Sequence, residues 1–167
     1  MTPILTAHTF DVITHSVEQT YRLGELLGHS LEPGMIVCLQ GDLGSGKTCL
    51  TQGIGRGLNV EGVINSPTFV FINEYGPSGE GPYLYHVDLY RIHDAADTLA
   101  LGLEDYIYSN GVTVIEWCDR ATEIMPDQRL WISLTYLDES KRSLLFDPTG
   151  DEYVRLLDGL RDDVLGG

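Results

Sequence analysis

The chain has 167 residues, of which 43% are hydrophobic, enough for one domain with a real core. Its formal net charge of -15 argues against strong direct binding to nucleic acid, because such binding depends on Lys and Arg side chains that neutralise phosphates. No apolar run reaches the roughly 18 residues of a membrane span, and the N-terminus lacks the pattern of a secretory signal, so we expect a cytoplasmic protein.

Strands and helices alternate along the chain and predict one domain over residues 1–167. In chain order we predict a strand at 9–14, a helix from 16 to 28, a strand at 35–39, a helix at 47–56, strands at 68–75 and 83–87, helical turns at 94–99 and 104–108, strands at 112–115, 130–136 and 143–146, and a helix at 154–160. Residues 158–167 are predicted to form a frayed tail. This pattern predicts a three-layer α/β fold, in which helices flank a mixed, mostly parallel central sheet.

The first predicted helix carries signals for both of its ends. Ser16 and Gln19 have the spacing of a capping box, in which the serine caps the helix and the glutamine reaches back to it. Apolar residues then recur at helical spacing, and Gly28 is the predicted terminator.

Residues 41–48 read GDLGSGKT, a complete match to the phosphate-binding loop G-x-x-x-x-G-K-[ST]. A β-prone run precedes the loop and a helix can follow it, so backbone N–H groups would face a phosphate chain at the positive end of that helix. Lys47 can reach the β- and γ-phosphates, and Thr48 can place its hydroxyl on a magnesium ion. The residues predicted to contact the nucleotide are Gly41, Asp42, Leu43, Gly44, Ser45, Gly46, Lys47, Thr48, Cys49, Thr68 and Trp117.

Two acidic residues follow predicted strands and are candidates for the magnesium site. Glu116 comes after four apolar residues that suit a buried strand, and Asp88 ends the strand at 83–87. A carboxylate at the tip of a strand beside the phosphate loop can hold magnesium or its water shell. Lys47, Asp88 and Glu116 are therefore the predicted catalytic residues, and Thr48, Asp88 and Glu116 are the predicted metal ligands.

Other residues near these motifs allow two interpretations each. The Thr68 hydroxyl can meet the γ-phosphate or the magnesium ion, although Ser66-Pro67 by itself is typical of an ordinary turn. Trp117 can report the nucleotide state or simply pack in the core. His86 and Arg91 flank Asp88, and a structural role is the more common one for each, although Arg91 can also pair with a phosphate or with Asp88.

Taken in order, five motifs of this chain resemble the TsaE family (also called YjeE) of small bacterial ATPases. The motifs are GDLGSGKT at 41–48, SPTF at 66–69, HVDLYR at 86–91, LGLEDY at 101–106 and IEW at 115–117. Together they cover most of residues 34–120. Two positions depart from the common family pattern: Ser45 replaces an alanine, and Cys118 replaces a proline or similar residue.

The resemblance implies magnesium-dependent ATP hydrolysis in the biosynthesis of threonylcarbamoyladenosine in tRNA. It implies TsaB and TsaD as protein partners, with TsaD carrying out the transfer and the ATPase resetting or activating the complex. It also places Thr68 in a first switch and Asp88 in a second. The strong acidity then has two interpretations, solubility or docking onto a basic partner.

Two other functions use the same loop. A small-molecule kinase would need an acceptor pocket and usually an arginine-rich lid, and the arginines after Asp88 are sparse. A non-catalytic switch would bind ATP tightly without releasing phosphate.

Overall fold

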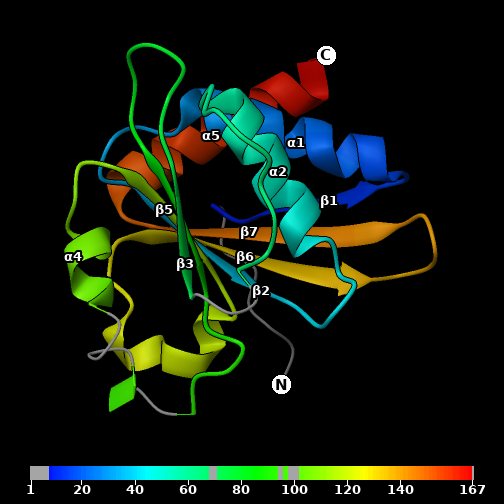
Figure 1. The fold of residues 1–167 in the computed structure, drawn as a ribbon. Coiled ribbons are helices and arrows are strands. Elements are labelled where there is room, and N and C mark those ends of the chain that lie inside the picture. Colours follow the sequence, from blue (N-terminus) through cyan, green and yellow to red (C-terminus); the bar gives the residue numbers. More distant parts are fainter. Residues whose placement is uncertain (1–7, 68–70, 94–95, 98–101, 167) are drawn as a thin grey trace.

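The computed structural model describes residues 8–67, 71–93, 96–97 and 102–166. Within those residues, seven strands form one sheet in the order β1-β7-β6-β2-β5-β4-β3 (Figure 1). The strands are β1 (Phe10–Thr14), β2 (Ile36–Gln40), β3 (Ile72–Tyr75), β4 (Leu84–Asp88), β5 (Val112–Glu116), β6 (Arg129–Tyr136) and β7 (Arg142–Thr149). The helices are α1 (Val17–Ser30), α2 (Lys47–Gly57), α4 (Leu103–Ile107), α5 (Asp151–Gly166) and the 3-10 helix η1 (Cys118–Ile124).

The sheet is mixed, as predicted, with its parallel strands at the centre. Strands β6, β2, β5 and β4 run parallel to one another, and antiparallel strands flank them on both sides. The two predicted hairpins are present as β3–β4 and β6–β7, although residues 68–70 of the first lie outside the described residues. So does most of the helical turn predicted at 94–99. Because β2, β5 and β4 are parallel, their carboxyl ends lie at the same edge of the sheet, which is where the phosphate loop leaves β2.

Helices cover both faces of the sheet and give the three layers predicted. Helices α1, α2 and α5 pack on one face, while α4 and η1 pack on the other (Figure 1). Buried strand residues alternate between the two cores: Val37 and Leu39 of β2 face α2, whereas Ile36 and Cys38 face η1 and α4. Strands buried on both faces are rich in apolar residues, and β2 has a continuous apolar run over residues 36–39. Strand β5 is buried throughout, with Thr113 and Glu116 as its polar members.

Helix α1 begins as predicted and ends later. The Ser16 side chain accepts a hydrogen bond from the Gln19 N–H at 3.1 Å, but the Gln19 side chain accepts from the His15 N–H at 2.8 Å, one residue before the cap. The prediction that Gly28 ends the helix is wrong, because α1 continues to Ser30.

Gly28 instead allows α1 and α2 to pack with their backbones in close contact. A Cβ atom at Gly28 would lie 2.3 Å from the Ile54 carbonyl oxygen, and one at Gly53 would lie 2.1 Å from that of Tyr21. Gly24 and Gly57 are equally crowded by the facing helix. The four glycines at this crossing therefore let the backbones of α1 and α2 approach closely.

The C-terminal helix is longer than predicted, and the predicted frayed tail at 158–167 is helical as far as Gly166. The apolar stripe of α5 extends past Leu160 to Val164, which packs against the core. Arg161 adds a hydrogen bond from its Nη2 to the Thr9 carbonyl oxygen at 2.7 Å. These contacts lie in the segment that was predicted to fray.

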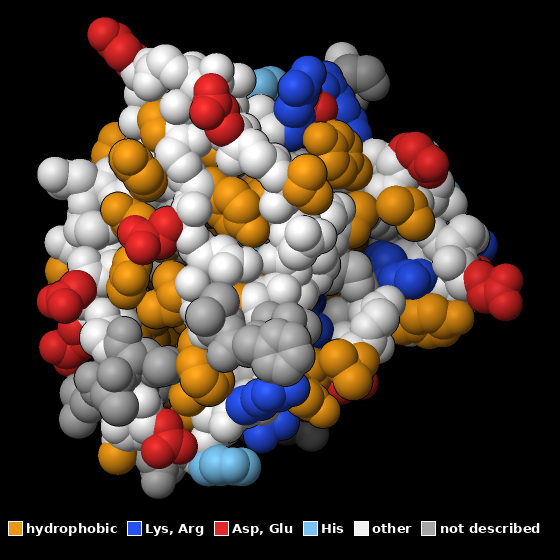
Figure 2. Space-filling model, viewed as in Figure 1, with side chains coloured by type: hydrophobic (Ala, Val, Ile, Leu, Met, Phe, Trp, Pro, Cys, Tyr) orange, Lys and Arg blue, Asp and Glu red, His pale blue; other side chains and the backbone are white. Residues whose placement is uncertain are grey.

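Acidic side chains are scattered over the face of the molecule shown in Figure 2, among apolar and basic ones, instead of forming one patch there. In the described part of the chain, no helix is both long and apolar enough to cross a bilayer.

Candidate functional site

The loop between β2 and α2 has a backbone suited to holding an anion. Gly44 and Gly46 have φ angles of 80° and 103°, in the left-handed region that favours glycine. Gly46 directly precedes the first turn of α2, and no described side chain caps that end of the helix. The N–H groups at the start of α2 are thus open to a negatively charged ligand at the positive end of the helix.

Lys47 lies across the mouth of this loop. Its ammonium donates hydrogen bonds to the carbonyl oxygens of Gly41 at 2.6 Å and Asp42 at 3.0 Å. It also lies 4.3 Å from the centroid of the Trp117 ring, a cation–π distance. The side chain is buried, so its position is fixed by the loop and by the tryptophan together.

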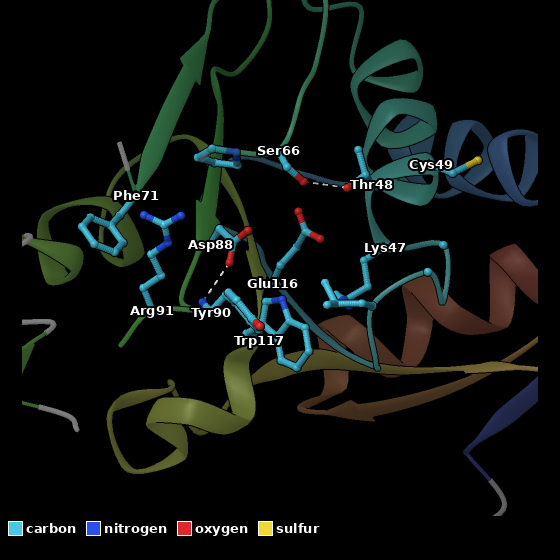
Figure 3. Close-up of a pocket in the computed structure, with 14 residues that line it drawn as sticks. Lys47, Thr48, Cys49, Ser66, Phe71, Asp88, Tyr90, Arg91, Glu116 and Trp117 are labelled. Carbon is cyan, nitrogen blue, oxygen red and sulfur yellow. Dashed lines mark hydrogen bonds between the residues drawn. The ribbon is translucent and has the colours of Figure 1, made fainter. Parts of the chain in front are cut away.

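The two predicted carboxylates lie at neighbouring strand tips. Asp88 ends β4 and Glu116 ends β5, and the two residues are register partners in the parallel sheet. On its other side, Glu116 pairs with Leu39 of β2, just before the phosphate loop. Paired residues of parallel strands point to the same face, so both carboxylates point toward α2 and the loop (Figure 3).

Burial shifts the pKa of both Lys47 and Asp88, and neighbouring groups oppose part of each shift. Burial lowers the pKa of Lys47, and the nearby carboxylates, led by Glu116 and then Asp88, oppose that shift. Burial also raises the pKa of Asp88, although a hydrogen bond from the Tyr90 N–H at 2.8 Å favours the ionised carboxylate. One ammonium therefore faces two carboxylates in a partly dehydrated space.

Two hydrogen bonds involve residues that were not among the predicted site residues. The Thr48 hydroxyl bonds the Ser66 hydroxyl at 2.8 Å, and the His86 Nε2 atom bonds the Glu116 carboxylate. The motif at 66–69 had pointed to Thr68, which lies outside the described residues. His86 stands two positions before Asp88 on one strand, so strand alternation places both on the same face, and this signal was available in the sequence.

A pocket of about 450 Å³ joins these groups (Figure 3). Its lining consists of Leu43, Gly44, Gly46, Lys47, Thr48, Cys49, Ser66, Pro67, Phe71, Asp88, Tyr90, Arg91, Glu116 and Trp117. Arg91, whose role the sequence left open, thus lines the pocket. Phe71 and Tyr90 also line it, although neither was among the predicted site residues.

Some predicted contact residues are not in the pocket lining. Gly41 and Asp42 line a neighbouring hollow of about 300 Å³ on the other side of Trp117. Ser45 is buried, and its hydroxyl has no hydrogen-bond partner among the described residues. Cys49 touches the pocket, but its thiol points away from the carboxylates and donates to the Val17 carbonyl oxygen at 3.4 Å (Figure 3).

Trp117 has a backbone conformation that is uncommon for a residue with a side chain, with φ 60° and ψ 36°. This turn ends β5 and starts η1, and it places the indole ring beside the phosphate loop. The ring packs 5.0 Å from that of Tyr90, and the Arg120 guanidinium lies 5.6 Å from both rings. Trp117 is therefore a wall of the pocket, with Lys47 above it.

The donor set of the site fits a magnesium ion that arrives with a triphosphate. Among the described residues, no group of three or more His, Cys, Asp or Glu side chains could hold a metal alone. Magnesium prefers oxygen ligands and is commonly bound through one or two carboxylates together with substrate phosphates. The hydroxyl of Thr48 and the carboxylates of Asp88 and Glu116 supply oxygen ligands of this kind.

Comparisons with known proteins agree on one family. The family model described as "Threonylcarbamoyl adenosine biosynthesis protein TsaE" matches residues 14–144. The tRNA threonylcarbamoyladenosine biosynthesis protein TsaE of Bacillus subtilis is 37% identical over 147 residues, which cover 88% of this chain and 90% of that protein. The protein of the same name from a Nostoc species is 44% identical over 135 residues, with 78% and 81% covered. The crystal structure of Bacillus subtilis YdiB superposes with a TM-score of 0.80 at 30% identity, covering 93% of this chain and 96% of that one.

Proposed function

The chain belongs to the TsaE family, and from this membership and the geometry of its pocket we propose that it is the ATP-binding and ATP-hydrolysing subunit required for threonylcarbamoyladenosine modification of tRNA. The relatives carry the name of a tRNA threonylcarbamoyladenosine biosynthesis protein, which supports the pathway. Support for the ATPase activity comes from the convergence of Lys47, Thr48 and Glu116 on one pocket at the carboxyl edge of the sheet.

The residues of the pocket have distinct tasks in this proposal. The N–H groups at the start of α2 and the Lys47 ammonium hold the phosphates of ATP. Thr48, Asp88 and Glu116 are the residues that would hold magnesium, which when bound would neutralise charge on the transferred phosphate. Glu116 could also orient the attacking water molecule.

The proposed partners are TsaB and TsaD. TsaD would transfer the threonylcarbamoyl group, and the present chain would reset or activate that complex by hydrolysing ATP. Hydrolysis by the chain alone would then be slow, and docking would stimulate it.

The decisive experiment measures phosphate release from ATP by the purified chain, with and without the TsaB–TsaD complex. We expect slow magnesium-dependent release that the complex accelerates. Tight ATP binding without phosphate release, even with both partners, would instead indicate a non-catalytic switch. Phosphorylated product from a panel of small acceptors would indicate a kinase.

Replacing Thr48 with alanine should weaken the magnesium dependence of ATP binding. The ratio of the Kd measured in EDTA to that measured with magnesium should fall about tenfold, which corresponds to about 1.4 kcal/mol. The Thr48 hydroxyl is the group that connects α2 to the proposed ion, so Thr48→Ser should keep most of the parent ratio. A Thr48→Ala protein with the parent ratio would remove Thr48 from the metal site.

A further inference from the structure

His86 is a fully buried polar residue that the catalytic assignments above leave without a role. Its side chain is 0% exposed, and its Nε2 atom bonds one carboxylate oxygen of Glu116. Its Nδ1 atom has no hydrogen-bond partner among the described residues. Burying a polar group costs free energy unless the group is hydrogen-bonded. The bond to Glu116 therefore offsets part of the cost of burying the His86 side chain.

The sheet register explains how the histidine reaches the glutamate. His86 pairs directly with Val114 of β5, and Glu116 stands two residues further along the same strand. Both side chains are on the face that α2 covers, so the imidazole lies on a diagonal to the carboxylate, within reach of a long side chain. The strand residues on this face further from the pocket are apolar: Leu84, Val112 and Val114 belong to the core that also contains Leu50 and Ile54 of α2.

The buried imidazole of His86 bonds one oxygen of the Glu116 carboxylate, at the strand tip beside the phosphate loop. Glu116 is itself buried, and among the described residues His86 is the one side chain that hydrogen-bonds its carboxylate. We propose that His86 is a positioning residue that fixes the rotamer of Glu116, so that the second carboxylate oxygen stays directed into the pocket. This inference rests on the proposed ATPase function and extends it to a residue that does not touch the nucleotide.

The bond has a defined polarity. An ionised carboxylate can only accept, so in the pair that we propose the ring nitrogen Nε2 is the donor. A glutamine at position 86 also carries an N–H donor at the end of a side chain of similar reach, whereas leucine fills similar space without one. These two replacements therefore separate the hydrogen bond from the packing of the side chain.

The test compares His86→Leu, His86→Gln and a surface control, His29→Leu, in ATP hydrolysis with the TsaB–TsaD complex present. For His86→Leu we expect kcat to fall about 10- to 100-fold, the usual effect of removing a group that orients a catalytic ligand. The Kd for ATP should change less than about threefold, because the phosphate loop is intact. His86→Gln should recover most of kcat, and the exposed control should match the parent chain.

A double replacement shows whether His86 acts through Glu116. In a Glu116→Ala background, adding His86→Leu should cost no further activity, because the group that it positions is gone. Nuclear magnetic resonance of the nucleotide-free chain gives a second readout: a slowly exchanging His86 Nε2 proton that disappears in Glu116→Ala. This readout stands even if His86→Leu fails to fold.

The outcomes separate the two proposals. A parent chain that never hydrolyses ATP would overturn the proposed function. An active parent whose His86→Leu variant keeps the parent kcat, or whose two losses simply add, would overturn the positioning role alone. Absence of the protected Nε2 proton in the parent chain would overturn it as well.

Discussion

Lys47→Ala is expected to abolish ATP binding under ordinary assay conditions. The variant loses the single ammonium in the pocket lining, and hydrogen bonds to charged groups typically contribute about 1.5–3 kcal/mol each. It also removes the ammonium that offsets part of the negative charge of the Asp88 and Glu116 carboxylates beside the phosphates. We therefore expect the Kd to rise at least about 100-fold, which corresponds to about 3 kcal/mol.

The chain offers a matched control for this experiment. Its only other lysine, Lys141, is exposed in the turn between β6 and β7. Lys141→Ala removes the same charge from the molecule and should leave the Kd for ATP within about twofold, because exposed charges contribute little. Titration calorimetry of the two variants measures both values. Equal affinities in the two variants would mean that the phosphate site lies elsewhere.

Glu116→Ala is expected to keep ATP binding and lose turnover. The carboxylate lies at the tip of β5. Its proposed task is to hold magnesium or orient water in the reaction, whereas the proposed task of α2 and Lys47 is to hold the phosphates. Groups with such tasks typically contribute about 100- to 1,000-fold to the rate, so kcat should fall by that factor while the Kd changes only a few-fold.

Two companion variants make the Glu116 result specific. Glu116→Gln keeps the shape of the side chain and an oxygen that can accept from His86, but not the charge, so a loss of turnover there assigns the effect to the carboxylate. Glu123→Ala removes an exposed acid of η1 and should behave as the parent chain. Single-turnover phosphate release and a separate ATP titration provide the two quantities. Hydrolysis at the parent rate in Glu116→Ala would show that the assignment is wrong.

The local parts of this site could be predicted from sequence. The phosphate loop is a contiguous motif, and Gly44, Gly46, Lys47 and Thr48 line one pocket at the start of α2, whereas Gly41 lines the neighbouring hollow. Glu116 and Asp88 each follow an apolar β-prone run, and parallel strands bring such ends to one edge of a sheet. These predictions depend on patterns that span only a few consecutive residues, so a single sequence is enough to make them.

The parts that sequence reasoning missed depend on contacts between distant segments. The hydrogen bond between His86 and Glu116 requires the β4–β5 register, which no short stretch of sequence specifies. Glycine is common at helix ends, so Gly28 was predicted to end α1. Its role in the close packing of α1 against α2 depends on a segment that is distant in sequence. The last helix continues because Arg161 bonds the Thr9 carbonyl and lies over the Phe10 ring of β1, and because Val164 packs against the core. The sequence had predicted a frayed tail in this segment.

The glycine contact between α1 and α2 also restricts how the molecule can respond to its nucleotide. Two helices whose backbones touch cannot slide or tilt without steric overlap, so α1 and α2 act as one rigid block that carries the phosphate loop. Under the proposed function, a structural signal of ATP turnover would then leave through the opposite wall of the pocket, where Ser66, Tyr90 and Trp117 belong to loops and turns. We therefore expect a partner that distinguishes the nucleotide states to contact that wall.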